Sequence, residues 1–238
     1  MGLDRIHTVV SIKRMNEPDT RSRLLDAAER LFAEEGFAGV GLRAITAAAG
    51  ANLAAVNYHF GSKEGLLHAV LERRITPLNA EHMARLAALE DQHRAGPLPL
   101  EGLLRALLEP LAHHPVIGDR SHFGRLLSRV YIHQDDRDQM EPMLNELSGD
   151  IRRRFVMALR VALPHLDVET FFYRGAFLSG AMWAGMAQLD AQAACVARSG
   201  EDWAPQHIDA QRAIEELIRF CHGGLLAAAS SAEEQGHA

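Results

Sequence analysis

The sequence predicts an all-α protein in which a small three-helix domain precedes a larger helical domain. Apolar residues recur at helical spacing in both halves of the sequence, and strand-like alternation of apolar and polar residues is absent from residue 76 onward. Capping residues and glycines divide the first 75 residues into short helices, whereas the remainder has longer helices with short breaks. We therefore expect a flexible arm at 1–19, domains at 20–75 and 76–230, and a frayed tail at 231–238.

The first helix is predicted at residues 21–35. Thr20 is its expected N-cap and Gly36 its expected C-terminal stop. The stretch "TRSRLLDAAERLFAEEGF" places five apolar side chains at helical spacing, namely Leu24, Leu25, Ala28, Leu31 and Phe32.

Two short helices around a tight turn are predicted next. "GLRAITAAAG" gives a helix that ends at Gly50, and Asn52 then caps a third helix. A rotation of about 100° per residue divides this third helix into two faces. The inner face holds Leu53, Val56 and Phe60, and the outer face holds Ala54, Ala55 and Tyr58, with Asn57 and His59 at the flanks. A glycine turn before a short helix with a free outer face indicates a helix-turn-helix, whose second helix lies in the major groove of DNA.

Basic and polar side chains lie where the phosphates of that DNA would run. Arg43 and Thr46 are on the second helix, and Lys63 is one of only two lysines in the chain. Ser62 is expected to cap the helix that Lys63 begins, and the free amides of a first helical turn attract anions. Each residue alone could be an ordinary surface side chain, but their joint arrangement favours a phosphate-binding edge.

The net charge of −6 is compatible with DNA binding because the acidity lies in the C-terminal part. Residues 1–75 carry ten basic and nine acidic residues, and the remaining 163 residues have a net charge of −7. Phosphate binding depends on where charges sit rather than on their total.

The stretch "LLDAAERLFAEEGFAGVGLRAITAAAGANLAAVNYHFGSKEGLL" resembles the N-terminal DNA-binding region of TetR-family bacterial transcriptional regulators. The resemblance covers residues 21–75 and is most specific in "YHFGSKEGLL". It implies that Tyr58, His59 and Lys63 contact DNA, mainly at phosphate, with Asn57 near the base edges. The sequence departs from the family at "NLAAV", where polar or basic residues are common, so direct hydrogen-bond readout would be sparse there. The alanines can still contact thymine methyl groups. The complete expected DNA surface is Arg43, Thr46, Asn52, Ala54, Ala55, Asn57, Tyr58, His59 and Lys63.

The C-terminal part is expected to contain helices with short breaks. Pro77 suggests a bend after the connecting helix, and "RAGPLPLEG" is the clearest loop. The predicted helices span 78–94, 99–114, 119–134, 139–164, 168–197 and 207–229.

Two of these helices are candidates for a homodimer interface. "FFYRGAFLSGAMWAGMAQL" mixes small and large side chains, and the last helix carries an apolar stripe. Two such helices from each subunit form a four-helix interface, although a plain buried helix explains most of the pattern equally well. The expected interface residues are Ala176, Gly180, Ala184, Ile214, Leu217 and Cys221.

The resemblance also implies an inducer site in this half, for which the middle helices supply apolar candidates. Each could be plain core; a pocket of such residues suits an apolar or acyl-type small molecule, with Arg129, Arg152 or His133 available for a polar head. The expected lining is Leu104, Leu108, Phe123, Leu127, Tyr131, Phe155, Leu159, Trp183 and Met186.

Other functional classes receive little support from the motifs. A glycine-rich phosphate loop, an H-E-x-x-H pair and a nucleophile elbow are absent from the sequence, which argues against an enzyme. His113 and His114 diverge by about 100° on a helix, so we expect no metal site and no cofactor. No apolar run suits a membrane helix, and the two cysteines, Cys195 and Cys221, fit small buried residues, so we expect a cytoplasmic chain.

The expected function is a ligand-responsive transcriptional regulator, a repressor that leaves a palindromic operator when its inducer binds. The expected partners are double-stranded operator DNA, the small-molecule inducer and a second copy of the chain. The alternative is a helical protein-interaction module that does not bind DNA.

Overall fold

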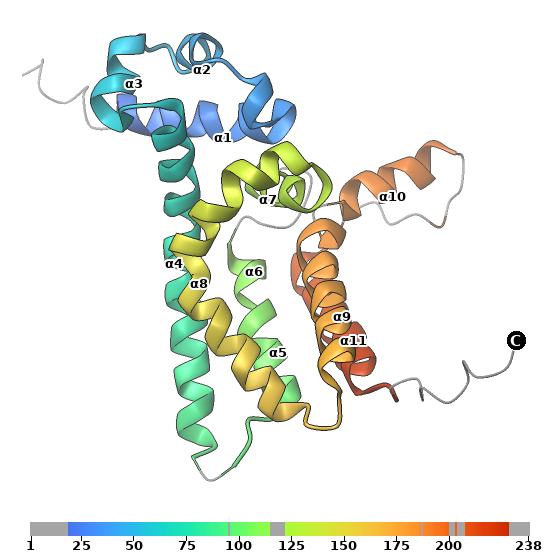
Figure 1. Cartoon of the computed structure of the whole chain (residues 1–238). Helices are drawn as coiled ribbons and strands as arrows, with labels where there is room; N and C mark the ends of the chain where they lie inside the picture. Colours follow the sequence, from blue (N-terminus) through green and yellow to red (C-terminus); the bar gives the residue numbers. More distant parts are fainter. Residues whose placement is uncertain are drawn as a thin grey trace, which may run out of the picture.

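A computed structural model describes residues 19–94, 96–114, 122–186, 188–199, 203 and 208–228. Throughout these residues the regular structure is helical, and the predicted all-α fold is confirmed (Figure 1). The expected arm, apart from Asp19, and the expected tail at 231–238 lie outside the described residues. Within the described residues, no helix is both long enough and apolar enough to cross a membrane.

Three helices form the N-terminal head: α1 (Thr20–Gly39), α2 (Leu42–Ala48) and α3 (Leu53–Phe60). Helix α1 is capped by Asp19, whose side chain accepts a hydrogen bond from the Ser22 amide, and not by Thr20. Gly36 interrupts α1 with a φ of 81°, as its expected role as a stop requires. The N-cap predicted for α3 is confirmed, since the Asn52 side chain accepts from the Ala55 amide.

Helix α4 (Lys63–Gln92) joins the head to the rest of the molecule, here called the body. The boundary that we expected at Pro77 is wrong, because this proline lies within one continuous helix of 30 residues. Proline removes one backbone hydrogen bond, but Ile75 and Leu78 are buried on either side and hold the helix together by packing. One continuous helix therefore begins at Lys63, beside the head, and packs against the body helices along the rest of its length.

The body helices pack beside α4, with α8 running along it and α9 and α11 on the far side (Figure 1). Their bounds are α5 (Leu100–Leu108), α6 (Pro110–His113), α7 (His122–Ile132), α8 (Gln134–Ala162), α9 (Val168–Gly180), η1 (Ala181–Gly185), α10 (Leu189–Arg198) and α11 (Ala210–Leu226).

Several predicted boundaries in the body are wrong. The helix expected at 99–114 divides before Pro110, which supplies no amide to continue α5. The helix expected at 168–197 is interrupted by a π-helical turn, η1, and by the non-helical Gln188. The helix expected from residue 139 begins at Gln134, where Asp135 and Asp136 favour a helix start. Of the two cysteines, Cys221 is buried as expected, but Cys195 is exposed.

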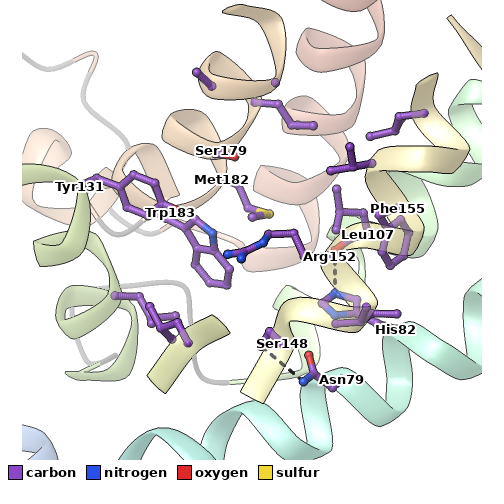
Figure 2. A pocket seen from close by; sticks show the side chains of 18 of the residues that line it. Asn79, His82, Leu107, Tyr131, Ser148, Arg152, Phe155, Ser179, Met182 and Trp183 are labelled. Carbon is purple, nitrogen blue, oxygen red and sulfur yellow. Dashed lines mark hydrogen bonds between the residues drawn. The ribbon is translucent and has the colours of Figure 1, made fainter. Parts of the chain in front are cut away.

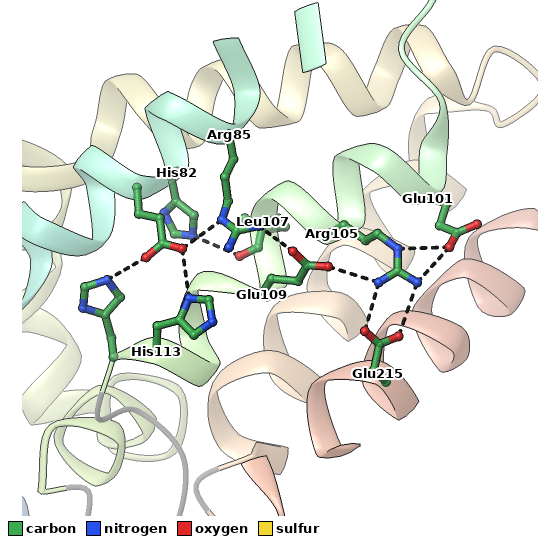
Figure 3. A network of polar contacts seen from close by, with 10 residues as sticks. His82, Arg85, Glu101, Arg105, Leu107, Glu109, His113 and Glu215 are labelled. Carbon is green, nitrogen blue, oxygen red and sulfur yellow. Dashed lines mark hydrogen bonds and ion pairs between the residues drawn. The ribbon is translucent and has the colours of Figure 1, made fainter. Parts of the chain in front are cut away.

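A chain of ion pairs fastens the body helices together (Figure 3). Arg105 of α5 contacts Glu101, Glu109 and, on α11, Glu215, and these carboxylates raise the pKa of Arg105. Arg85 of α4 bonds to Glu109 and to Glu81, joining α4 to α5. His113 and His114 both contact the carboxylate of Glu81, at 3.1 and 3.2 Å. Among the described residues, no group of three or more His, Cys, Asp or Glu side chains is arranged to hold a metal ion.

Head and body meet at a buried carboxylate. Asp136, in the first turn of α8, accepts a hydrogen bond from the Phe37 amide at 3.0 Å and from Arg129 Nε of α7 at 2.6 Å. The Arg129 guanidinium lies directly against Gly36, so a side chain at Gly36 would collide with it. One carboxylate thus joins the end of α1 to α7 and α8, and we call these four residues the joint.

Candidate functional site

Helix α3 presents a surface formed by its outer face. Tyr58 is 86% exposed, and Ala54, Asn57 and His59 are exposed beside it. The rings of Tyr58 and His59 meet edge to face with centroids 4.9 Å apart. Val56 is fully buried and Phe60 half-buried, as expected, but Leu53 is 45% exposed and joins the outer surface instead of the core. Ala55, expected on the outer face, is half-buried against the core.

The turn from α3 to α4 depends on two glycines and a serine. Gly61 has a φ of 75°, which a residue with a side chain rarely adopts. Ser62 then caps α4, accepting from the Gly65 amide at 3.0 Å, as predicted. A side chain at Gly65 would collide with the backbone carbonyl of Phe60, so the end of α3 is held directly against the start of α4.

Lys63 begins α4, and its side chain is partly buried. Its Nζ lies 4.3 Å from the centroid of the Phe37 ring, a cation–π contact that ties α4 to the end of α1. Burial lowers the pKa of Lys63. A helix start favours acidic side chains, so a lysine there gains most when an anion lies nearby.

The remaining expected DNA residues differ in exposure. Arg43 and Asn52 are exposed. Thr46 is buried, and its hydroxyl donates to the carbonyl of Arg43, because the short α2 turns this side chain toward the core. The expected surface did not include Arg21, whose guanidinium lies 5.5 Å from the Phe60 ring centroid, next to α3. Arg21 lies next to α3 only because α1 packs against α3, and no local sequence pattern indicates this contact.

The body contains a cavity of about 460 Å³ with mainly apolar walls. Five of the expected lining residues do line it: Leu127, Tyr131, Phe155, Leu159 and Trp183. The other four, Leu104, Leu108, Phe123 and Met186, are buried in the core and do not line the cavity. Their periodicity marked them correctly as buried, but periodicity does not show which buried side chains border a void.

Helix α4 contributes cavity residues that the sequence analysis did not name. Ile75, Leu78, Asn79 and His82 form one wall, and the last three lie beyond Pro77, the expected end of the connecting helix. The Asn79 side-chain amide donates to the Leu147 carbonyl at 2.7 Å and to the Ser148 hydroxyl at 3.4 Å. Figure 2 shows the Asn79–Ser148 bond and the contact of His82 Nε2 with the Leu107 carbonyl oxygen, at 2.9 Å. Burial lowers the pKa of His82. The π-helical turn η1 places Met182 and Trp183 on the opposite side.

The expected polar-head residues occupy three different environments. Arg152 lines the cavity and points toward Trp183 (Figure 2). Arg129 is held by Asp136 in the joint, and His133 is the N-cap of α8; neither lines the cavity. Burial raises the pKa of Tyr131, so its phenol is neutral at pH 7.

The expected dimer residues divide into two groups. Ala176 is exposed, Ala184 is half-buried, and a side chain added at Gly180 would meet open space. Ile214, Leu217 and Cys221 are buried within the chain, where α11 packs against α5 and α6, so they are not free to meet a second copy. Burial raises the pKa of Cys221 to about 11. The helices α9 and α11 instead expose large side chains that are not among the expected interface residues: Tyr173, Phe177, Phe220 and Leu226.

The chain matches two family models. Residues 24–70 match the model of bacterial regulatory proteins of the tetR family, and residues 105–224 match a tetracyclin repressor-like C-terminal domain. Among curated proteins it is 30% identical over 131 residues to the HTH-type transcriptional repressor NicS of Pseudomonas putida, covering 55% of this chain and 57% of that protein. It is 29% identical over 161 residues to the HTH-type transcriptional regulator TtgR of the same species, covering 63% and 72%.

Solved structures share the fold at lower identity. A TetR-like transcriptional regulator from Rhodococcus sp. RHA1 has a TM-score of 0.51 at 20% identity, covering 90% of this chain and all of that one. The TetR-family regulator PfmR from Thermus thermophilus has a TM-score of 0.50 at 18% identity, covering 87% and 99%. The family models together span the head and most of the body, and they describe transcription factors and not enzymes. The chain therefore belongs to the tetR family of bacterial transcriptional regulators.

Proposed function

We propose that the chain is a ligand-responsive repressor that binds a palindromic operator as a homodimer and leaves it when a small apolar molecule fills the cavity. The observation that carries this proposal is the course of α4. Its first residue, Lys63, lies beside α3, and its middle residues, including His82, form a cavity wall. A change in the cavity that displaces α4 therefore displaces the head.

A second connection between cavity and head supports the same mechanism. Leu127 and Tyr131 of α7 line the cavity, while Arg129, between them, is held in the joint with Asp136 and Gly36. A ligand releases DNA only if it binds the released conformation better than the DNA-bound one. Ligand contacts on α7 supply that difference if they change how Asp136 holds the Phe37 amide.

The proposed DNA surface is the outer face of α3 with the start of α4. Tyr58 is 86% exposed on α3 and is suited to reach a groove, while Lys63 and the α4 amides are suited to a phosphate. Arg43, Asn52, Asn57 and His59 remain proposed contacts because they are exposed around these two. For Thr46 we propose a supporting role, since its hydroxyl is bonded to Arg43.

Variants at Tyr58 and Lys63 test the DNA surface. On DNA from upstream of the gene, Tyr58→Ala should weaken specific binding by about 1–3 kcal/mol per half-site and affect random DNA less. Lys63→Ala should weaken both DNAs similarly and reduce the salt dependence by about one ion per subunit. Fluorescence anisotropy at two salt concentrations measures both effects. A parent protein without salt-sensitive, sequence-selective binding would contradict the proposal and favour a protein-interaction module.

The proposed dimer interface is the outer surface of α9 and α11, which pack against each other. Phe177 and Phe220 are 70% and 72% exposed there, and exposed aromatic side chains of this kind are typical of protein interfaces. Phe220→Glu should place a charge in the interface and shift the chain toward monomer in light scattering, with little loss of monomer stability. Met157→Glu, at a 61% exposed apolar position on α8, is the control for added charge away from α9 and α11. An unchanged dimer in Phe220→Glu would exclude this surface.

A further inference from the structure

The cavity wall carries one positive charge and no negative one. Among the described residues that line the cavity, Arg152 is the only arginine or lysine, and no aspartate or glutamate is present. His82 does not add a charge, because burial lowers its pKa. Its Nε2 faces a carbonyl oxygen, which only accepts, so Nε2 of the neutral ring carries the proton.

The charge of Arg152 lacks a carboxylate partner within the described part of the chain. The next two residues, Arg153 and Arg154, pair with Asp150 and Glu90. Arg152 instead donates to the neutral amide oxygen of Asn145. A guanidinium has five N–H donors, so one bond to an amide leaves a fork of donors available.

Arg152 is exposed to solvent and also lines the cavity, so its free donors border the cavity. Figure 2 shows its side chain extending from α8 toward Trp183 of η1, between the two sides of the cavity. Guanidinium groups bind carboxylates through two parallel hydrogen bonds and tolerate aromatic neighbours better than an ammonium group does. Because the remaining wall is mainly apolar, the rest of a bound molecule would lie against carbon.

We propose that the cavity binds an organic anion with an apolar body and one carboxylate, which Arg152 holds. This inference rests on the proposed function, because it names the ligand class of the same cavity. A volume of about 460 Å³ falls within the range of small-molecule sites and leaves room for a ten-carbon chain. Neutral molecules of the same shape bind more weakly, and cations are repelled by Arg152.

The test compares three ligands that share a ten-carbon chain: decanoate, decan-1-ol and decyltrimethylammonium. Trp183 and Trp203 are the two tryptophans of the chain, so a Trp203→Phe background makes fluorescence report on the cavity. Decanoate should bind at least about tenfold more tightly than decan-1-ol, and decyltrimethylammonium should bind most weakly. Arg152→Gln should abolish the preference for decanoate, and Arg152→Lys should retain part of it. Arg153→Gln is the matched control, since Arg153 is on the same helix but does not line the cavity.

Three results would contradict the proposed ligand class. Equal binding of decanoate and decan-1-ol, a preference that survives in Arg152→Gln, or no binding of any of the three would overturn it. The proposed function is judged separately by adding decanoate to the complex with operator DNA. Tight, Arg152-dependent binding that leaves operator affinity unchanged would keep the ligand assignment and reject ligand-controlled release.

Discussion

The candidate functional residues of the head face outward to solvent, whereas those of the body face inward to a cavity. In the head the interior is filled, with Val56 and Ile45 fully buried, and the proposed DNA contacts project outward from α3. In the body the candidate residues face inward around a cavity of about 460 Å³. We therefore expect the stability of the head to depend on close backbone contacts. In the body, we expect ligand binding to depend on the volume and the charge of the cavity. The joint is where a change in one region reaches the other.

The largest effect is expected at the joint. Asp136→Ala removes the one carboxylate that pairs with Arg129 among the described residues, and it leaves the buried Phe37 amide without its acceptor. We expect a loss of about 3 kcal/mol in the free energy of unfolding, measured by urea denaturation. Asp138→Ala is the control, because this exposed residue on the same helix bonds only to Gln134 in the described structure, and it should cost less than about 0.5 kcal/mol. Equal costs for the two variants would mean that the joint does not hold head to body.

A glycine-to-alanine substitution should lower stability in the head and raise it in the body. Gly65→Ala forces a side chain against the Phe60 carbonyl and should destabilise the head by about 2 kcal/mol. Gly149→Ala in the middle of α8 meets open space and should stabilise the protein by about 0.5–1 kcal/mol, because alanine favours helix. Thermal unfolding of both variants measures the difference. A stable Gly65→Ala protein would show that α3 and α4 can separate without cost.

The head was predictable because local signals determine it. Asn52 and Ser62 cap α3 and α4 through hydrogen bonds within three residues, and Gly36 stops α1 through its own backbone conformation. The errors there arise from competition between neighbours: Asp19 caps α1 one residue before Thr20. Leu53 has the periodicity of a core residue but lies in the first turn of a short helix, where little packs over it.

The body was predictable as helical but not in its contacts. Packing of Ile75 and Leu78 carries α4 through Pro77, although proline locally favours a break. The apolar stripe of α11, which includes Ile214, would be apolar whether it packed against α5 or against a second subunit. The sequence pattern therefore does not distinguish core from interface. The cavity is formed by residues from α4 to α11 that are far apart in the chain, and single-helix patterns do not reveal such a void.

The smallest expected effect concerns the pH dependence of the body. Burial is the main cause that lowers the pKa of His82, with a smaller contribution from Arg85 and His114, while the Leu107 carbonyl and Glu81 oppose it. The folded protein thus binds a proton at His82 less readily than the unfolded chain does. The resulting stability is fully present above the unfolded pKa of about 6.5 and is lost as the pH falls through the lower folded value.

His82→Gln removes this titration and keeps a donor for the Leu107 carbonyl. Between pH 7 and 5 the parent should lose stability more steeply than the variant, by at most about 1.4 kcal/mol per pH unit for one proton. Urea denaturation at a series of pH values gives the two slopes. His93→Gln, at the exposed end of the same helix, controls for removal of a histidine. If the slope in His82→Gln equals that of the parent, the buried ring does not titrate in this range, and acid sensitivity of the body has another origin.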